Sequence, residues 1–200
     1  MPGLYDVKVV NPGGLSAVRV GAVRVMFQKP LDILVSTGYS PVFLTGDSWF
    51  TETWNQVGYW LGGEASLSVF FIKKSWGFIG IEAGATVHQM SGGTERAQVS
   101  SDYMLSGGSV IYKYRINKLI HVLAKTGAGV SVSSHSFVYS GMEGPSADFS
   151  SLYLSAGLAA QYFLPNNFYI EGGIGWTGIP SGNAFASLVR PVLKAGYKLF

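Results

Sequence analysis

The side chains of this sequence best suited to chemistry are three histidines and the polar residues spaced around them. Strand residues an even number of positions apart point to the same side, so His121, Lys125 and His135 are expected on one face. His88 is placed similarly beside Glu82. Such groups could bind a metal ion or transfer protons. Because they are spread along the strands, we expect ordinary polar contacts and neither a metal nor a cofactor.

A serine and a histidine on one face suggest a hydrolase. Ser133 and His135 meet this condition, but no glutamate is placed to orient the histidine, so a triad lacks its third member. Carboxylates predicted in loops could form a protease site together with His88 or His135. These carboxylates are Asp47, Asp102 and Asp148. Loop carboxylates are commonly just solvated. We therefore expect no enzymatic activity and keep a hydrolase as the third alternative.

The composition shows what kind of structure must position these groups. Of the 200 residues, 48% are apolar and only 12% are charged, against about 25% charged in ordinary soluble proteins. Something other than water must therefore cover much of the surface. No run approaches the roughly 18 apolar residues of a membrane-spanning helix. The absence of cysteine excludes disulfides and thiol chemistry. The net charge of +3 is small and the basic residues are scattered along the sequence, which argues against a nucleic-acid partner.

Turn signals divide the chain into strands. Short polar breaks occur at 29–30, 73–75, 116–118 and 165–167, and longer polar stretches at 45–56, 91–102, 141–148 and 178–184. Short turns alternating with long loops are typical of membrane barrels. Eight strands are predicted, at 31–45, 57–72, 76–90, 103–116, 118–140, 149–164, 167–178 and 185–200. Each is long enough to cross a bilayer, which needs about 9 to 11 tilted residues.

Within these strands, apolar residues alternate with small or charged ones. One face of 149–164 is wholly apolar and includes Leu152, Leu154 and Leu158. The opposite faces carry charges of both signs, which we interpret as a charge network in the lumen: Asp32, Glu64, Glu82, Glu171, Lys113, Arg115, Lys125, Arg190 and Lys194. An eight-stranded barrel is only just filled by its own side chains, and unpaired buried charge is costly. We therefore expect paired charges to plug the interior and prevent a wide pore.

The predicted fold is an all-β, transmembrane, antiparallel up-and-down barrel of eight strands forming one domain over residues 1–200. The first 30 residues leave two alternatives open. Residues 4–10 and 15–28 read as strands across the turn signal at 11–14. They form either an N-terminal hairpin of the barrel, giving ten strands, or an extension. Aromatic residues gather at both ends of the predicted strands, as in interfacial girdles, and those near the short turns include Phe168 and Tyr169.

Two segments carry a family resemblance. Residues 31–43, with a central Gly-Tyr pair, and the terminal segment Gly196, Tyr197 to Phe200 resemble the small bacterial outer-membrane barrels, the group that includes OmpX, the OmpA transmembrane domain, opacity-type proteins and OmpW. The terminal segment is similar to the assembly signal of that group, although Phe200 is out of phase with Tyr197. The resemblance implies location in the bacterial outer membrane, contact with outer-membrane lipid or lipopolysaccharide, and recognition by the barrel-assembly machinery.

The same resemblance frames three functional hypotheses. The first is a non-enzymatic barrel whose external loops serve adhesion, envelope structure or docking with other envelope proteins. The second is a narrow channel or transporter for small hydrophobic molecules, as in OmpW. The third is an outer-membrane hydrolase. Exposed aromatic clusters can mark contact sites, and the loop at 45–56 carries Trp49, Phe50 and Trp54. An extension of the aromatic girdle is the alternative interpretation of that loop.

Overall fold

The computed structural model describes residues 3–10, 16–25, 31–46, 59–74, 76–94, 97–144, 146–181 and 184–199. The chain divides into two compact units, Met1–Pro30 and Leu31–Phe200. Nearly all described residues lie in β-strands, and a single short 3₁₀ turn covers Pro165–Asn167. Among these residues, no helix has the length and apolar character needed to cross a membrane.

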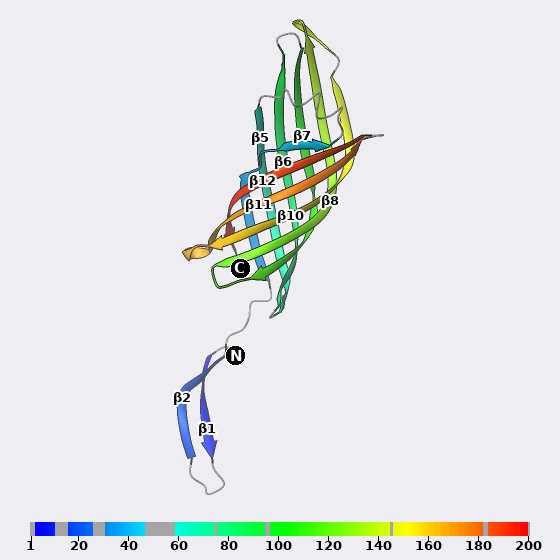
Figure 1. Ribbon diagram of the computed structural model, residues 1–200. Helices are drawn as coiled ribbons and strands as arrows, with labels where there is room; N and C mark the ends of the chain where they lie inside the picture. Colours follow the sequence, from blue (N-terminus) through cyan, green and yellow to red (C-terminus); the bar gives the residue numbers. More distant parts are fainter. Residues whose placement is uncertain are drawn as a thin grey trace. The chain divides into compact units, whose positions relative to one another are not determined.

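The larger unit is a closed antiparallel ring (Figure 1). Its eight strands are β3 (Asp32–Tyr39), β5 (Tyr59–Lys74), β6 (Gly77–Thr94), β7 (Ala97–Arg115), β8 (Ile120–Tyr139), β10 (Ala147–Phe163), β11 (Phe168–Ser181) and β12 (Ala184–Lys198). Strand β12 pairs with β3, which closes the ring. The short β4 (Phe43–Gly46) also pairs with β12, and β9 (Met142–Glu143) pairs with β8. The predicted eight-stranded barrel is confirmed.

The smaller unit contains a two-stranded sheet of β1 (Gly3–Val10) and β2 (Ser16–Val25). The two strands predicted before residue 30 therefore exist. Their register shifts at Asp6, whose Oδ1 accepts a hydrogen bond of 2.8 Å from the Gly21 amide. Gly21 has a φ of 64°, a conformation that favours glycine. Because β12 pairs with β3, the ring closes without this hairpin, and the ten-strand alternative is not realised.

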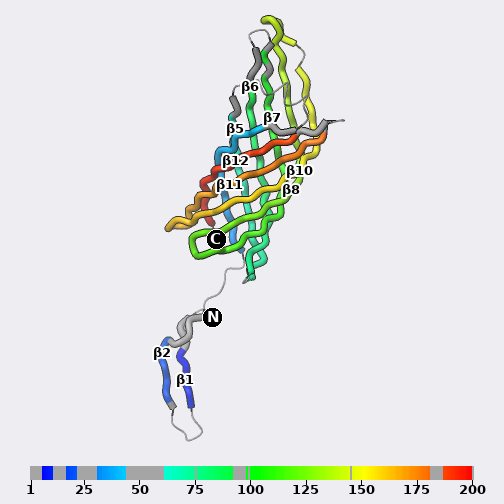
Figure 2. The backbone as a smooth tube through the Cα atoms, in the orientation of Figure 1, coloured from blue at the N-terminus to red at the C-terminus, as the bar shows by residue number. Residues whose placement is uncertain are grey.

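Strands extend further than expected at the end of the ring opposite the short turns. Pairing between β6 and β7 continues to Thr94 and Ala97, and between β11 and β12 to Ser181 and Ala184. Most of the polar stretches expected as loops at 91–102 and 178–184 are therefore strand. The reason is that a polar side chain does not prevent its backbone from joining a ladder. Figure 2 shows β6, β7, β8 and β10, coloured green to yellow, extending beyond β11 and β12.

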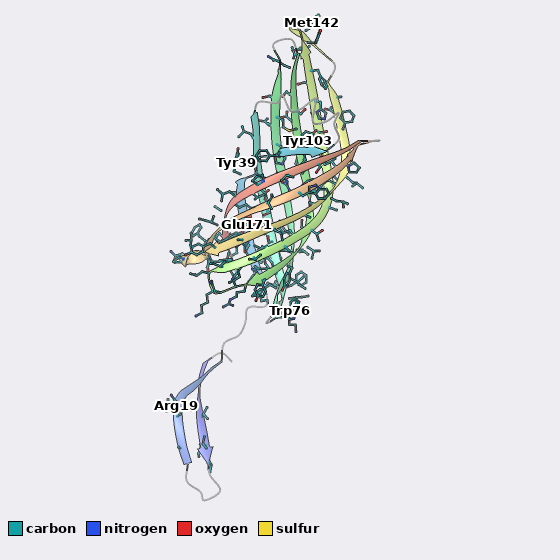
Figure 3. The ribbon with its side chains drawn as sticks, viewed as in Figure 1. Arg19, Tyr39, Trp76, Tyr103, Met142 and Glu171 are labelled. Atoms are coloured by element: carbon teal, nitrogen blue, oxygen red, sulfur yellow. The ribbon has the colours of Figure 1, made fainter. Side chains whose placement is uncertain are left out.

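We call this the tall end, and the end with the β5–β6, β7–β8 and β10–β11 turns the short-turn end. Figure 3 labels Met142 at the tall end and Trp76 at the short-turn end. Between the two ends, the outward side chains are large and apolar. Leu152, Leu154 and Leu158 are 70%, 63% and 62% exposed. A continuous apolar exterior of this kind is stable in lipid rather than water, so the ring spans a membrane.

Aromatic side chains surround the short-turn end. Those at least one third exposed there are Phe71, Trp76, Tyr112, Tyr114, Tyr162 and Phe168. This is the arrangement expected of an interfacial girdle. Tyr169 was expected among them, but it is only 2% exposed. The prediction was wrong for Tyr169 because the neighbouring position, Phe168, takes the outward orientation, and alternation then turns Tyr169 into the barrel.

Candidate functional site: an ion-pair belt inside the barrel

The central part of the barrel interior consists of three layers. An apolar cluster near the tall end contains Val42, Met90, Tyr103, Leu105, Ile179 and Leu188. A second apolar cluster near the short turns contains Leu34, Phe70, Ile111, Leu123 and Tyr169. Between them lies a belt of charged side chains, here called the ion-pair belt: Glu64, Glu82, Glu171, Lys125, Arg190 and Lys194. Figure 3 labels Glu171 at this middle level.

Lys125 is the centre of one half of the belt. Its Nζ lies 2.8 Å from Glu171 Oε1 and 3.1 Å from Glu82 Oε2. Neutral side chains also donate to these carboxylates. Gln161 Nε2 donates to Glu171 Oε2 at 2.7 Å, and Ser68 Oγ donates to Glu82 Oε2 at 2.9 Å. Charge-assisted hydrogen bonds of this kind offset the cost of burying ions.

Glu64 is the centre of the other half. It forms an ion pair with Lys194, and Arg190 Nη1 lies 3.8 Å from its Oε2. Lys194 is also 4.0 Å from Glu171, which joins the two halves. Gly38 lies opposite both Lys194 and Glu64 on the strand between them. A Cβ at Gly38 would meet the Lys194 backbone and side chain, so a glycine is needed for this lysine to cross the strand.

Asp32 belongs to a different group of charges, near the short turns. Its Oδ1 lies 2.8 Å from Lys73 Nζ and 2.8 Å from Lys198 Nζ. Lys73 was not among the predicted lumen residues, because 73–75 was predicted as a turn, and strict alternation continued along β5 would turn it outward. A register shift between Phe70 and Ile72 turns it back toward Asp32. Such a bulge reverses the face to which every later residue of the strand points. No residue type in the sequence predicts it.

Besides Asp32, two further members of the predicted network lie outside the belt. Lys113 is buried, but within the described part of the chain no carboxylate lies at ion-pair distance; its Nζ lies 3.7 Å from the centre of the Phe70 ring. It therefore makes a cation–π contact in the lower apolar cluster. Arg115 is exposed, because it is the last residue of β7 and extends past the wall. The prediction of a lumen ion pair is corrected for both residues.

The structure pairs His135 with a different serine from the one considered in the sequence. Ser101 lies directly opposite His135, and its Oγ is 2.6 Å from His135 Nδ1. Ser133, the serine considered from sequence, is buried on the same face of β8. The Ser101–His135 contact could not be inferred from spacing, because the two residues are 34 positions apart and meet only through the register of β7 and β8. Ser101 is 1% exposed, so this contact is buried inside the barrel.

The other histidines lie at separate levels. His88 is 1% exposed near the tall end, whereas His121 packs against Phe78 and Phe163 near the short turns. Over the described ranges, no three side chains suitable as metal ligands come together.

A cavity of about 80 Å³ opens beside the ion-pair belt. It is lined by all six charged belt residues and by small side chains, including Ser109 and Ser155. The apolar clusters lie on either side of it along the barrel axis. The space available inside this part of the barrel is therefore small and lined largely by charged and small side chains.

The remaining predicted sites lie near the chain end or outside the described residues. Gly196 provides room for the Tyr169 ring, and Tyr197 packs edge-on against Phe168 with ring centres 4.9 Å apart. The Leu199 amide donates to the Ile33 carbonyl at 2.8 Å. Phe200 lies outside the described residues, as do the three aromatic residues of the predicted contact loop: Trp49, Phe50 and Trp54.

Comparisons with known proteins bear on the fold. Neither the family models nor the curated proteins compared with this sequence gave a match. Among solved structures, the chain is similar to Ail, the attachment invasion locus protein of Yersinia pestis, in complex with the heparin analogue sucrose octasulfate. The TM-score is 0.57 at 17% identity, over 86% of this chain and 100% of that one.

A second similar structure is a major outer membrane protein from Thermus thermophilus. The TM-score is 0.59 at 13% identity, over 84% of this chain and 99% of that one. At these identities the likeness concerns the fold. Together with the closed ring and the apolar exterior, it shows that this chain has the fold of the small outer-membrane β-barrels.

Proposed function

We propose that this chain is a non-conducting, non-enzymatic barrel of the bacterial outer membrane that presents its tall end to a protein partner. The observation that carries this proposal is the three-layered interior. Two apolar clusters lie on either side of the ion-pair belt, and the cavity beside the belt is small, at about 80 Å³. Such an interior favours an anchoring role over transport of hydrophilic solutes or of small hydrophobic molecules.

The absence of a pore is tested by conductance. The purified full chain is inserted into planar bilayers, and we expect no stable single-channel openings like those of a general porin. Steady openings at moderate voltage would overturn the anchoring role. A variant with Lys125→Ala and Glu82→Ala provides the comparison, because it empties part of the belt and is expected to conduct more often than the wild type.

The tall end supplies the surface for a partner. Strand β8 has 20 residues and β7 has 19, whereas a tilted strand crosses a bilayer with about 9 to 11. The additional residues extend these strands beyond the bilayer by roughly 20 Å, at about 3.4 Å per residue and a 45° tilt. Exposed side chains on this extension include Phe137, Tyr139, Met142 and Phe149. Apolar groups exposed among polar ones are typical of a protein contact.

Charge argues against one ligand class. The related fold of Ail was solved with a heparin analogue, which is polyanionic. At the tall end of this chain the charged residues that the structure describes are Asp102, Glu143 and Asp148, and all three are exposed. Like charges repel, so a sulfated polyanion is disfavoured there. A protein with an apolar or basic surface suits this end better.

Two experiments test the orientation and the contact. The chain has no cysteine, so Met142→Cys and Lys118→Cys each introduce a unique thiol. A membrane-impermeant maleimide should label Met142→Cys on intact cells and label Lys118→Cys only after permeabilisation. The reverse pattern would contradict the proposed orientation.

For the contact, a photo-crosslinking residue is placed at Tyr139, with lipid-facing Leu154 as the matched control position. One discrete protein adduct at Tyr139 and none at Leu154 is expected in native membranes. Equal outcomes at the two positions would contradict docking at the tall end.

A further inference from the structure

Charge is segregated along the axis of this barrel. Basic residues at the short-turn end form a group that we call the basic rim: Lys73, Lys74, Arg115, Lys118 and Lys198. Asp32 is the one acidic side chain among the described residues of that end. At the tall end the described charges are all acidic. The belt between them contains equal numbers of acids and bases. Within the residues that the structure describes, the barrel therefore has one positive and one negative end.

Among the described residues, the rim carries more basic than acidic side chains. Asp32 is shared by Lys73 and Lys198, with 2.8 Å to each. One carboxylate thus faces two ammonium groups. Lys74, Arg115 and Lys118 are exposed, and no described carboxylate lies at ion-pair distance from them. These three side chains are free to meet an anion from outside the protein.

The rim coincides with the aromatic girdle. Trp76 and Tyr114 are each 51% exposed, and Tyr112 is 37% exposed. The Tyr112 hydroxyl donates to the Trp76 carbonyl at 2.6 Å, and the two rings stack with centres 6.0 Å apart. Lys74 lies two residues before Trp76, and Arg115 follows Tyr114. Girdle aromatics lie at the depth of the lipid headgroups, so the rim cations reach the headgroup phosphates.

We propose that the basic rim is a binding surface for anionic phospholipid headgroups in the leaflet around the short-turn end. Clusters of lysine and arginine beside a membrane segment attract anionic lipids. The guanidinium of Arg115 suits two phosphate oxygens at once, and the ammonium groups of Lys74 and Lys118 act as point charges. The bases occur on two separate hairpin turns and on the end of β12. This spread suits many lipids around a circumference better than one compact ligand.

The test measures lipid selectivity of the full chain in vesicles. Spin-labelled phosphatidylglycerol and phosphatidylcholine are compared for the fraction held at the protein surface. We expect the wild type to prefer the anionic lipid at least about twofold. For comparison, one lysine near an anionic surface corresponds to a roughly fivefold gain in affinity. The preference should fall as salt rises, because these charges are exposed.

The variant Lys74→Ser, Arg115→Ser, Lys118→Ser should lower the ratio to about one. It leaves Lys73 and Lys198 in place so that Asp32 remains paired. The matched control changes the same number of charges at the other end: Asp102→Asn, Glu143→Gln, Asp148→Asn. It should keep the preference, and circular dichroism checks that both variants fold. Equal lipid ratios in the wild type, or a preference that survives the rim variant, would overturn the proposal. So would full displacement of the anionic lipid by millimolar inorganic phosphate, because that indicates a site for free phosphate.

Discussion

The ion-pair belt and the basic rim use the same residue types in opposite ways. In the belt, three carboxylates face three cations, and every side chain in these pairs is at most 14% exposed. At the rim, Asp32 serves two lysines while Lys74, Arg115 and Lys118 face outward. The two groups are separated by the apolar cluster that contains Phe70 and Tyr169.

Burial explains the difference. An unpaired ion inside the barrel loses its hydration without compensation, so the belt must be close to neutral. At the membrane interface water and headgroups can solvate a charge, and an excess is tolerated. Belt residues should therefore determine stability, and rim residues should determine which lipids surround the protein. Four predictions test this division, from the largest expected effect to the smallest.

The largest effect is expected from Lys125→Met. The change leaves Glu82 and Glu171 buried without their shared cation, and breaking a buried pair costs about 3–5 kcal/mol. The free energy of unfolding is measured by denaturant titration in detergent micelles. Lys74→Met at the rim is the matched control and should change it by less than about 0.5 kcal/mol.

A triple variant sharpens this result. Adding Glu82→Gln and Glu171→Gln to Lys125→Met removes the stranded charges and should restore part of the lost stability. A triple variant less stable than Lys125→Met would show that the belt is not held by charge pairing.

Gly38→Ala is expected to have the next largest effect. The added methyl group would meet the Lys194 backbone and side chain where the lysine crosses toward Glu64. Overpacking of this kind typically costs about 1–3 kcal/mol. Gly63, a glycine on the neighbouring strand, has no atom within 4 Å of the position that an added methyl group would take. Gly63→Ala should therefore leave the denaturation midpoint unchanged, and equal losses in the two variants would contradict a specific role for Gly38.

Lys113→Met is expected to have a smaller effect of the opposite sign. This lysine is buried against Phe70 without a carboxylate at ion-pair distance in the described structure. Methionine removes the cost of burying the charge and loses a cation–π contact worth up to about 2 kcal/mol. We expect stability to be unchanged or to rise by about 1 kcal/mol. A loss of more than about 2 kcal/mol would mean that Lys113 acts like a belt residue.

The smallest effect on stability is expected for the rim variant Lys74→Ser, Arg115→Ser, Lys118→Ser. Exposed substitutions away from special contacts usually change stability by less than about 0.5 kcal/mol. Its unfolding curve should therefore overlay the wild-type curve even though its lipid preference is lost. A large destabilisation would remove the distinction between belt and rim.

Several features follow from the sequence alone, for a local reason. Apolar and polar residues alternate with period two, and strand geometry turns that alternation into two faces. Together with the turn signals, this is sufficient for the eight strands after residue 30, for an outward face with Leu152, Leu154 and Leu158, and for an inward face with Glu64, Glu82, Lys125 and Glu171. The scarcity of charged residues additionally predicts that lipid surrounds the barrel.

Tertiary structure decided which groups meet. Lys125 reaches Glu82 and Glu171 across 43 and 46 residues, and Ser101 reaches His135, because strand register and ring closure bring them to one level. The bulge after Phe70 turned Lys73 inward, and the closure of β12 on β3 left the first hairpin out of the ring. These outcomes depend on long-range pairing, which no local pattern of residue types encodes.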